Sequence, residues 1–403
     1  MSQRAGRHFL QIPGPTNVPD RVLRAMDRPT MDHRSPAFAE LVKGLKEPLR
    51  RIFGCAGPVI VYPASGSGAW EAALVNTLSP GDRVLMYETG HFAKLWAEIA
   101  TLLGLEPVIL PGSWRSGADA DAIGRALEQD RSHTIRAVCV VHNETSTGCV
   151  SPIADVRAAI DAAGHPALLM VDTISSLGSM PYAADEWGVD VTVAGSQKGL
   201  MLPPGLSFNA ISSKALDAAR AARLPRSYWD WSKMIDMNGR GFFPYTPATN
   251  MLYGLGEALA MLEEEGLDNV FARHARHAEA TRAAVRHWGL ETQCGHNGHH
   301  SNSLTAVRLP EGHSADRLRA VIADRFDMSL GNGLSQLADR VFRIGHLGDL
   351  NDLTLMGTLA GVEMGLSLAG VPHQAGGVQA AMAILSREET ETMQPIEMKR
   401  AAR

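Results

Sequence analysis

The chain has 403 residues, of which 45% are hydrophobic and 20% are charged. This composition excludes a disordered chain, and the length suits two domains better than one. The 38 basic and 43 acidic residues give a formal net charge of −5, so no basic excess is present to neutralise a phosphate backbone. We therefore expect no nucleic-acid partner.

The cysteines and the uncharged segments indicate the cellular compartment of the protein. The sequence contains four cysteines, Cys55, Cys139, Cys149 and Cys294. None forms a CxxC pair, so we expect neither a disulfide framework nor a metal site. The first ten residues lack the apolar region of a signal peptide, and the uncharged segment from Ile52 to Trp70 is interrupted by glycine and proline. These features predict a cytoplasmic protein that spans no membrane.

Over the first two-thirds of the chain, short apolar runs alternate with helical stretches. The predicted strands are Val59 to Tyr62, Arg83 to Tyr87, Ala137 to His142, Ala167 to Asp172, Val189 to Ala194 and Leu206 to Ile211. The predicted helices are Trp70 to Thr77, Phe92 to Leu103 and Ile153 to Ala163. Because the strands are apolar throughout rather than alternating, they indicate a mostly parallel sheet that is covered by helices on both faces.

The last third predicts a smaller α+β unit. Met251 to Trp288 is strongly helical, with a break near Gly266. The elements that follow are a strand at Ser303 to Leu309, a helix at Ser314 to Arg325, a strand at Val341 to Ile344 and a helix at Leu353 to Leu368. Gly331 to Gly333 is expected to be a loop, and the Gly/Ala-rich segment from Val371 has no predicted docking position.

A lysine follows directly after one of the buried strands, in Gly195-Ser196-Gln197-Lys198-Gly199. Burying an ammonium group is costly, and desolvation lowers the pKa of a lysine towards that of a reactive neutral amine. Such an amine can bond covalently to a carbonyl compound. On the pentapeptide alone, however, a lysine at a surface turn is the more frequent case.

The strand from Ala167 to Asp172 ends in a carboxylate. Open α/β folds bind their ligands at the carboxyl ends of strands. Facing a pyridine nitrogen, Asp172 would keep that nitrogen protonated, and an enzyme that uses pyridoxal phosphate (PLP) needs such an aspartate together with a reactive lysine. Taken alone, Asp172 is equally well interpreted as the N-cap of a following helix.

Two strand-to-helix or strand-to-loop turns offer further donors. In Ser65-Gly66-Ser67-Gly68, small residues let backbone N–H groups approach a phosphate, although the segment matches neither GxGxxG nor GK[ST]. A hydroxyl in His142-Asn143-Glu144-Thr145-Ser146-Thr147-Gly148 could donate to an oxygen of a cofactor. Turns of both kinds also occur as purely structural features.

Arg343 lies within the apolar strand Val341 to Ile344, which indicates a buried anionic partner. Its forked guanidinium matches a carboxylate bidentately, and the alternative partner is a structural Asp or Glu. His296, His299 and His300 have no standard zinc spacing and predict a solvated loop.

Together these segments resemble the class V aminotransferases, and within them the alanine/serine–glyoxylate group, closest to its bacterial serine–glyoxylate members. The resemblance covers Pro13 to Asn17, Asp32 to Ser35, Pro63 to Gly68, His142 to Thr145, Asp172 to Ser176, Gly195 to Gly205, Pro244 to Pro247 and Phe342 to Gly348. It implies the α/β architecture of PLP fold-type I, in which a large domain with a mostly parallel seven-stranded sheet precedes a smaller C-terminal α+β domain. The expected divisions are an N-terminal arm (1–17), the large PLP-binding domain (18–260), the small domain (261–375) and a tail (376–403).

The resemblance also implies roles for single residues. Lys198 would bond covalently to PLP and act in catalysis, with Asp172 at the pyridine nitrogen. The other cofactor-binding residues would be Ser65, Gly66, Ser67 and Gln197 at the phosphate, Thr145 at the phenolic oxygen, Phe92 and Ile174 on the two ring faces, and Tyr245 and Thr246 at the phosphate of a partner subunit. Arg343, Asn17 and Gly14 would bind the substrate.

The function that follows is amino transfer from a small L-amino acid to glyoxylate, in a homodimer with shared sites or in a tetramer of two such dimers. Serine is the expected donor, with alanine or aspartate as alternatives. Many serine–glyoxylate relatives read Asp-Gly-Val-Ser-Ser where this chain has Asp172-Thr173-Ile174-Ser175-Ser176, which leaves the donor open. The rival functions are a cysteine desulfurase or lyase of the same fold, with Cys294 as its only cysteine in the C-terminal third, and a catalytically silent binding protein.

Overall fold

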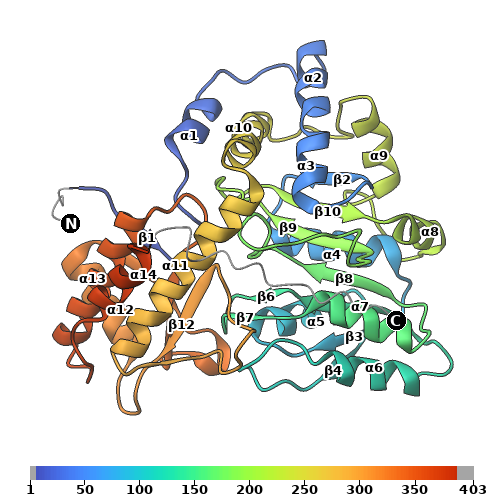
Figure 1. Ribbon diagram of the computed structural model, residues 1–403. Helices are drawn as coiled ribbons and strands as arrows, with labels where there is room; N and C mark the ends of the chain where they lie inside the picture. The colour runs from blue at the N-terminus through green and yellow to red at the C-terminus, as the bar shows by residue number, and fades with distance from the viewer. Residues whose placement is uncertain (1–5, 388–403) are drawn as a thin grey trace.

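The computed structural model describes residues 6–387, which form a large and a small α/β unit connected by long helices (Figure 1). The outermost parts of the expected N-terminal arm and tail, residues 1–5 and 388–403, lie outside the described residues. Each unit has its own cluster of buried apolar side chains, as two-domain chains of this length require.

The large unit is built on a seven-stranded sheet, as expected. In spatial order its strands are β2 (Val59–Tyr62), β10 (Ser207–Ile211), β9 (Val191–Gly195), β8 (Leu168–Asp172), β5 (Ile135–Val141), β3 (Arg83–Tyr87) and β4 (Glu106–Leu110). Only β10 runs against its neighbours, so the sheet is mostly parallel. The central strands are buried on both faces, which explains their unbroken apolar sequences.

Helices pack around this sheet and extend beyond its β2 edge. They are α1 (Asp20–Met26), α2 (Pro36–Gly44), α3 (Lys46–Phe53), α4 (Gly66–Thr77), α5 (His91–Leu102), α6 (Ala120–Gln129), α7 (Ile153–Ala162), α8 (Ser213–Ala221) and α9 (Trp231–Gly239). At the β2 edge, α3 and α9 both contact β2 (Figure 1). A short hairpin of β6 (Asn143–Glu144) and β7 (Cys149–Val150) follows β5.

The small unit has a five-stranded sheet in the order β1 (Phe9–Gln11), β13 (Met328–Asn332), β14 (Val341–Gly345), β12 (Leu304–Arg308) and β11 (Glu291–Thr292). Its first strand comes from the expected N-terminal arm and runs parallel to β13. The prediction of a loop at Gly331 to Gly333 is wrong for its first two residues, because Gly331 and Asn332 pair with β14. A short 3₁₀ turn at Ser335–Leu337 precedes β14.

Two long helices lead from one unit to the other, as the sequence predicts. They are α10 (Thr249–Glu265) and α11 (Leu267–His287), which meet at Gly266 with φ of +82°. The small unit is completed by α12 (Ala315–Phe326), α13 (Asp352–Leu368) and α14 (Gly377–Leu385), the last of which packs on α11. None of the helices within residues 6–387 combines the length and apolar character that crossing a bilayer requires.

Candidate active site

The side chain of Lys198 is buried just beyond the end of β9, where the N-terminal segment holds it. Its ammonium group donates a hydrogen bond to the carbonyl oxygen of Pro13. The hydroxyl of Thr16 donates to the carbonyl oxygen of Lys198 at 3.2 Å. Gly14 has φ of +95°, and a Cβ at this position would lie 2.3 Å from Cδ of Lys198. Gly14, predicted to bind the substrate, therefore lies directly against the lysine.

Asp172 ends β8, the strand next to β9. Its Oδ1 accepts a hydrogen bond from the backbone N–H of Ile174 at 2.7 Å, and its Oδ2 accepts one from Nε1 of Trp70 at 3.1 Å. Burial raises the pKa of Asp172 to about 7, although both donors act against this rise. No helix lies between β8 and β9, so the N-cap interpretation is wrong. Asp172 is a fixed carboxylate at the carboxyl edge of the sheet.

Lys198, Asp172 and Arg343 influence one another electrostatically. Burial lowers the pKa of Lys198 to about 8, the positive charge of Arg343 lowers it further, and the negative charge of Asp172 opposes both. The surface-turn interpretation of Lys198 is wrong, because only 9% of the residue is exposed. Near neutral pH, a fraction of this amine is neutral and can act as a nucleophile or a base.

The turn that was predicted to hold a phosphate lies at the N-terminus of α4. This helix begins at Gly66, four residues earlier than predicted, so Gly66 and Ser67 lie in its first turn. The hydroxyl of Ser65, the N-cap, makes no hydrogen bond to the helix within the described residues. A Cβ at Gly66 would lie 2.3 Å from Cδ1 of Ile174. Ile174 is therefore pressed against the phosphate turn.

Gln197 lies on the other side of Ile174. A Cβ at Gly195 would be 3.1 Å from Oε1 of Gln197 and 3.5 Å from Cγ2 of Ile174. Oε1 of Gln197 is buried and has no hydrogen-bond partner within residues 6–387. A buried polar atom without a partner is uncommon, and it indicates a ligand or water at this point.

Thr145 and Arg343 meet across the gap between the two units. Nη1 of Arg343 donates to the carbonyl oxygen of Thr145 at 2.9 Å, and its Nε donates to that of Asn332 at 2.8 Å. The hydroxyl of Thr145 donates to Oγ of Ser175 at 2.7 Å. Burial lowers the pKa of Arg343 to about 10. No Asp or Glu in the described part of the chain forms an ion pair with Arg343, so its guanidinium keeps donors for a ligand.

A model of the family described as Aminotransferase class-V matches residues 8–345, a range that includes all of these side chains. The chain belongs to the class V aminotransferases. Membership of this family implies PLP as the cofactor.

Individual relatives align over almost the whole of this aminotransferase. The serine–glyoxylate aminotransferase of Methylorubrum extorquens is 51% identical, over 95% of this chain and 97% of its own. The L-aspartate–glyoxylate aminotransferase of Paracoccus denitrificans is 45% identical, over 92% of this chain and 94% of its own. Among solved structures, the ureidoglycine–glyoxylate aminotransferase of Bacillus subtilis superposes with a TM-score of 0.88 at 28% identity, over 96% of this chain and 100% of its own. The fold is therefore that of fold-type I aminotransferases.

Glu144, to which the sequence analysis gave no role, caps a helix of the aminotransferase. Its carboxylate accepts hydrogen bonds from the backbone N–H groups of Phe92 and Ala93 and from both the N–H and the hydroxyl of Ser146. The N-cap of α5 is Gly90, which has no side chain, so Glu144 caps this helix from a distant segment. Burial raises the pKa of Glu144, and its four donors oppose that rise. No local sequence signal reveals a cap that comes from another segment.

Three further predicted residues of the aminotransferase make their contacts with other parts of the chain. The Asn17 amide donates to the carbonyl oxygen of Leu10 at 3.2 Å and lines a separate cavity beside α1. The ring of Tyr245 stacks on Tyr228 with centroids 3.9 Å apart, and Thr246 is exposed. Their predicted roles stay predictions.

The remaining cysteine and histidine candidates do not join the site. Cys294 is buried, and its thiol lies 3.7 Å from the carbonyl oxygen of His296. The rings of His296 and His299 stack at 4.0 Å. Within residues 6–387, no group of three or more His, Cys, Asp or Glu side chains could hold a metal ion.

Proposed function

We propose that this aminotransferase moves the amino group of a small L-amino acid to glyoxylate, with serine as the first expected donor and alanine or aspartate as alternatives. The observation that carries the proposal is the buried set of Lys198, Asp172 and Arg343. It combines a reactive amine, a carboxylate for a ring nitrogen and a cation for a substrate carboxylate. The relatives named for serine–glyoxylate and L-aspartate–glyoxylate transfer support the same substrates.

The residues around Lys198 fit PLP. The amine of Lys198 would hold its aldehyde carbon, and Asp172 would face its ring nitrogen. The uncommitted hydroxyl of Ser65 lies at the helix N-terminus where a phosphate would bind, and the side-chain NH₂ group of Gln197 is the donor that this residue would offer to it. The other proposed contacts are Gly66 and Ser67 at the phosphate, Thr145 at the phenolic oxygen, and Phe92 and Ile174 on the two ring faces.

When bound, PLP supplies an electron sink for negative charge that develops at the substrate α-carbon. The chain supplies the rest. Lys198, with its lowered pKa, takes the proton from that carbon and returns one later, as a general base and acid. Asp172 holds a positive charge at the ring nitrogen, and Arg343 fixes the carboxylate that the amino acid and glyoxylate share. Because donor and acceptor use this pocket in turn, ping-pong kinetics are expected.

A donor panel tests the proposed function. Serine, alanine and aspartate are each supplied with glyoxylate, and glycine is measured together with hydroxypyruvate, pyruvate or oxaloacetate. We expect glycine to form at the rate of the corresponding keto acid, and serine to give the highest kcat/KM. Formation of a protein persulfide from cysteine without glycine formation would instead favour the desulfurase alternative, although Cys294 is buried.

A homodimer is also part of the proposal. In its own chain Tyr245 donates to the carbonyl oxygen of Tyr228, and Thr246 is exposed. We propose that this segment reaches the phosphate of the neighbouring subunit. Whether two dimers pair into a tetramer is a further question for solution measurements.

A further inference from the structure

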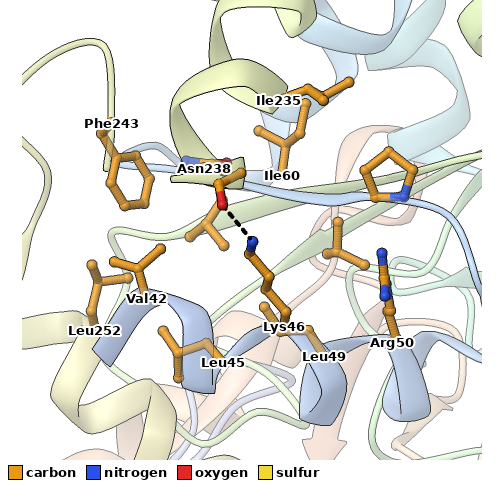
Figure 2. A pocket seen from close by; sticks show the side chains of 14 residues that line it. Val42, Leu45, Lys46, Leu49, Arg50, Ile60, Ile235, Asn238, Phe243 and Leu252 are labelled. Carbon is orange, nitrogen blue, oxygen red and sulfur yellow. Dashed lines mark hydrogen bonds between the residues drawn. The ribbon is translucent and has the colours of Figure 1, made fainter. Parts of the chain in front are cut away.

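A cleft outside the proposed active site lies at the β2 edge of the large sheet. It is open to solvent on one side and has a cavity volume of about 180 Å³ between α2, α3, β2, α9 and α10 (Figure 2). Most of its walls are apolar, and include Val42, Leu49, Ile60, Ile235, Phe243 and Leu252. A space of this size suits a short ligand rather than a drug-sized one. None of the residues proposed to bind PLP or the substrate lines it.

One cation points into these apolar surroundings. Figure 2 shows Lys46 reaching from α3 between the apolar side chains towards α9. Its ammonium group donates to the carbonyl oxygen of Gly239 at 3.4 Å, a distance typical of a weak hydrogen bond. None of the 14 lining residues is acidic, and no carboxylate within residues 6–387 forms an ion pair with Lys46. Lys46 therefore keeps donors for a ligand.

The second cation of the cleft is already engaged. Nε of Arg50 donates to the carbonyl oxygen of Gly57 at 3.1 Å, and its Nη1 donates to Glu47 at 2.7 Å. The cleft thus presents a single available positive charge against apolar walls. Lys46 is only half-buried, so an anion that enters the cleft can reach its ammonium group.

We propose that this cleft binds an amphipathic monocarboxylate. The carboxylate accepts hydrogen bonds from Lys46, and the aliphatic tail packs against the side chains of α2, β2 and α9. A ligand with two negative charges would leave one of them unpaired against the apolar walls, and a cationic ligand would face Lys46 directly. This site does not depend on the proposed amino transfer, so failure of either proposal leaves the other unaffected.

Calorimetric titration of the full-length protein with octanoate tests the proposal. We expect saturable binding of one octanoate per chain, at least tenfold weaker binding to Lys46→Gln, and recovered binding to Lys46→Arg. Shortening the tail to hexanoate should weaken binding about fourfold for each methylene group removed, because each buried methylene contributes a fixed apolar area. Octylamine, with the same tail and the opposite charge, should not bind.

Two control variants locate the ligand. Lys43→Gln is the matched control, since Lys43 lies on α2, is exposed and pairs with Glu40 at 2.9 Å outside the cleft. Arg343→Ala tests whether octanoate occupies the substrate pocket instead. Both variants should bind octanoate as the unmodified protein does. The proposal is overturned by absent octanoate binding, by full affinity in Lys46→Gln, by equal binding of octylamine, or by loss of binding in Arg343→Ala.

Discussion

The surroundings of Lys198 determine the pKa of its amine. Burial and the charge of Arg343 lower its pKa from 10.5 to about 8, against the charge of Asp172. Because the folded-state pKa lies below the ordinary value, the amine is protonated below about pH 8 and neutral above it. Only the neutral amine attacks an aldehyde, so its reactivity must rise with pH through this range.

The first prediction concerns that reactivity. When PLP is added to the apoprotein and trapped with borohydride, peptide mass spectrometry should find the label on Lys198. The initial rate of labelling should increase with pH and reach half of its maximum near pH 8. Lys198→Ala serves as the control and should lose the visible absorption of the bound cofactor. Labelling of a different lysine in the unmodified protein would contradict the assignment.

Arg343 provides a second prediction at the scale of single residues. Its guanidinium is 6% exposed and makes two hydrogen bonds to backbone carbonyls, which orient it for a carboxylate. Removing one partner of a buried charge pair costs roughly 2–5 kcal/mol. Arg343→Ala should therefore lower kcat/KM for both serine and glyoxylate by about 30- to 3000-fold, with the cofactor still bound.

Arg343→Lys is the informative comparison, because lysine keeps the charge and loses the fork. It should recover only part of the activity. The cofactor spectrum of each variant controls for loss of PLP. Near-normal kcat/KM in Arg343→Ala would move the carboxylate-binding group elsewhere.

At the scale of elements, α5 depends on a carboxylate from another part of the chain. All four groups that contact the Glu144 carboxylate are donors, and two of them are the free N–H groups of the first turn of α5. Gly90 makes this approach possible, because a Cβ there would lie 2.5 Å from Cγ of Glu144. The helix carries Phe92, the residue proposed to lie on the cofactor ring.

Glu144→Gln should therefore destabilise the protein by about 1–3 kcal/mol, since the amide nitrogen would face donors. The measurement is chemical unfolding of the apoprotein, which is independent of any cofactor. Ser146→Ala removes one of the four donors and should have a smaller effect. Equal stability of Glu144→Gln and the unmodified protein would show that the carboxylate is not needed as a cap.

Most of the central strands could be predicted from the sequence, because strands buried on both faces have continuous apolar runs. The edge strand β4 was not predicted, since Glu106 and Ile109 are exposed and Pro107 interrupts the pattern. Gly331 was expected in a loop, yet it lies in a strand where a Cβ would meet Cδ of Pro13 at 2.7 Å. A glycine is needed at this position because two distant segments pack closely there, and such packing leaves no periodic pattern in the sequence.

Several residues of the candidate site could be predicted from the sequence, but the contacts that hold them in place could not. Lys198, Asp172 and Arg343 could be identified because each breaks the apolar character of a buried strand or its end. Trp70 donates to Asp172, but the sequence indicates it only as the first residue of a helix. The helix that Glu144 caps begins about fifty residues earlier in the chain, so no local rule assigns this role.

For the whole molecule, the proposed dimer gives the last prediction. Thr246 is exposed within its own chain, and the neighbouring Tyr245 is half-buried and stacks on Tyr228. If this segment reaches the phosphate of a partner, Thr246→Ala should speed the loss of PLP in dialysis without unfolding the chain. Light scattering should give the mass of a dimer or a multiple of it. A fully active monomer would refute the shared site.

The segment from Phe9 to Thr16 belongs to both domains at once. It begins as β1 in the sheet of the small domain, and it ends at hydrogen bonds to Lys198 and Gln197 of the large one. Any rotation of one domain against the other would therefore pull on the Pro13 carbonyl that accepts from the lysine. Loosening that bond would leave the ammonium group of Lys198 without this acceptor. A movement between the two domains would therefore reach the lysine that is proposed to act in catalysis.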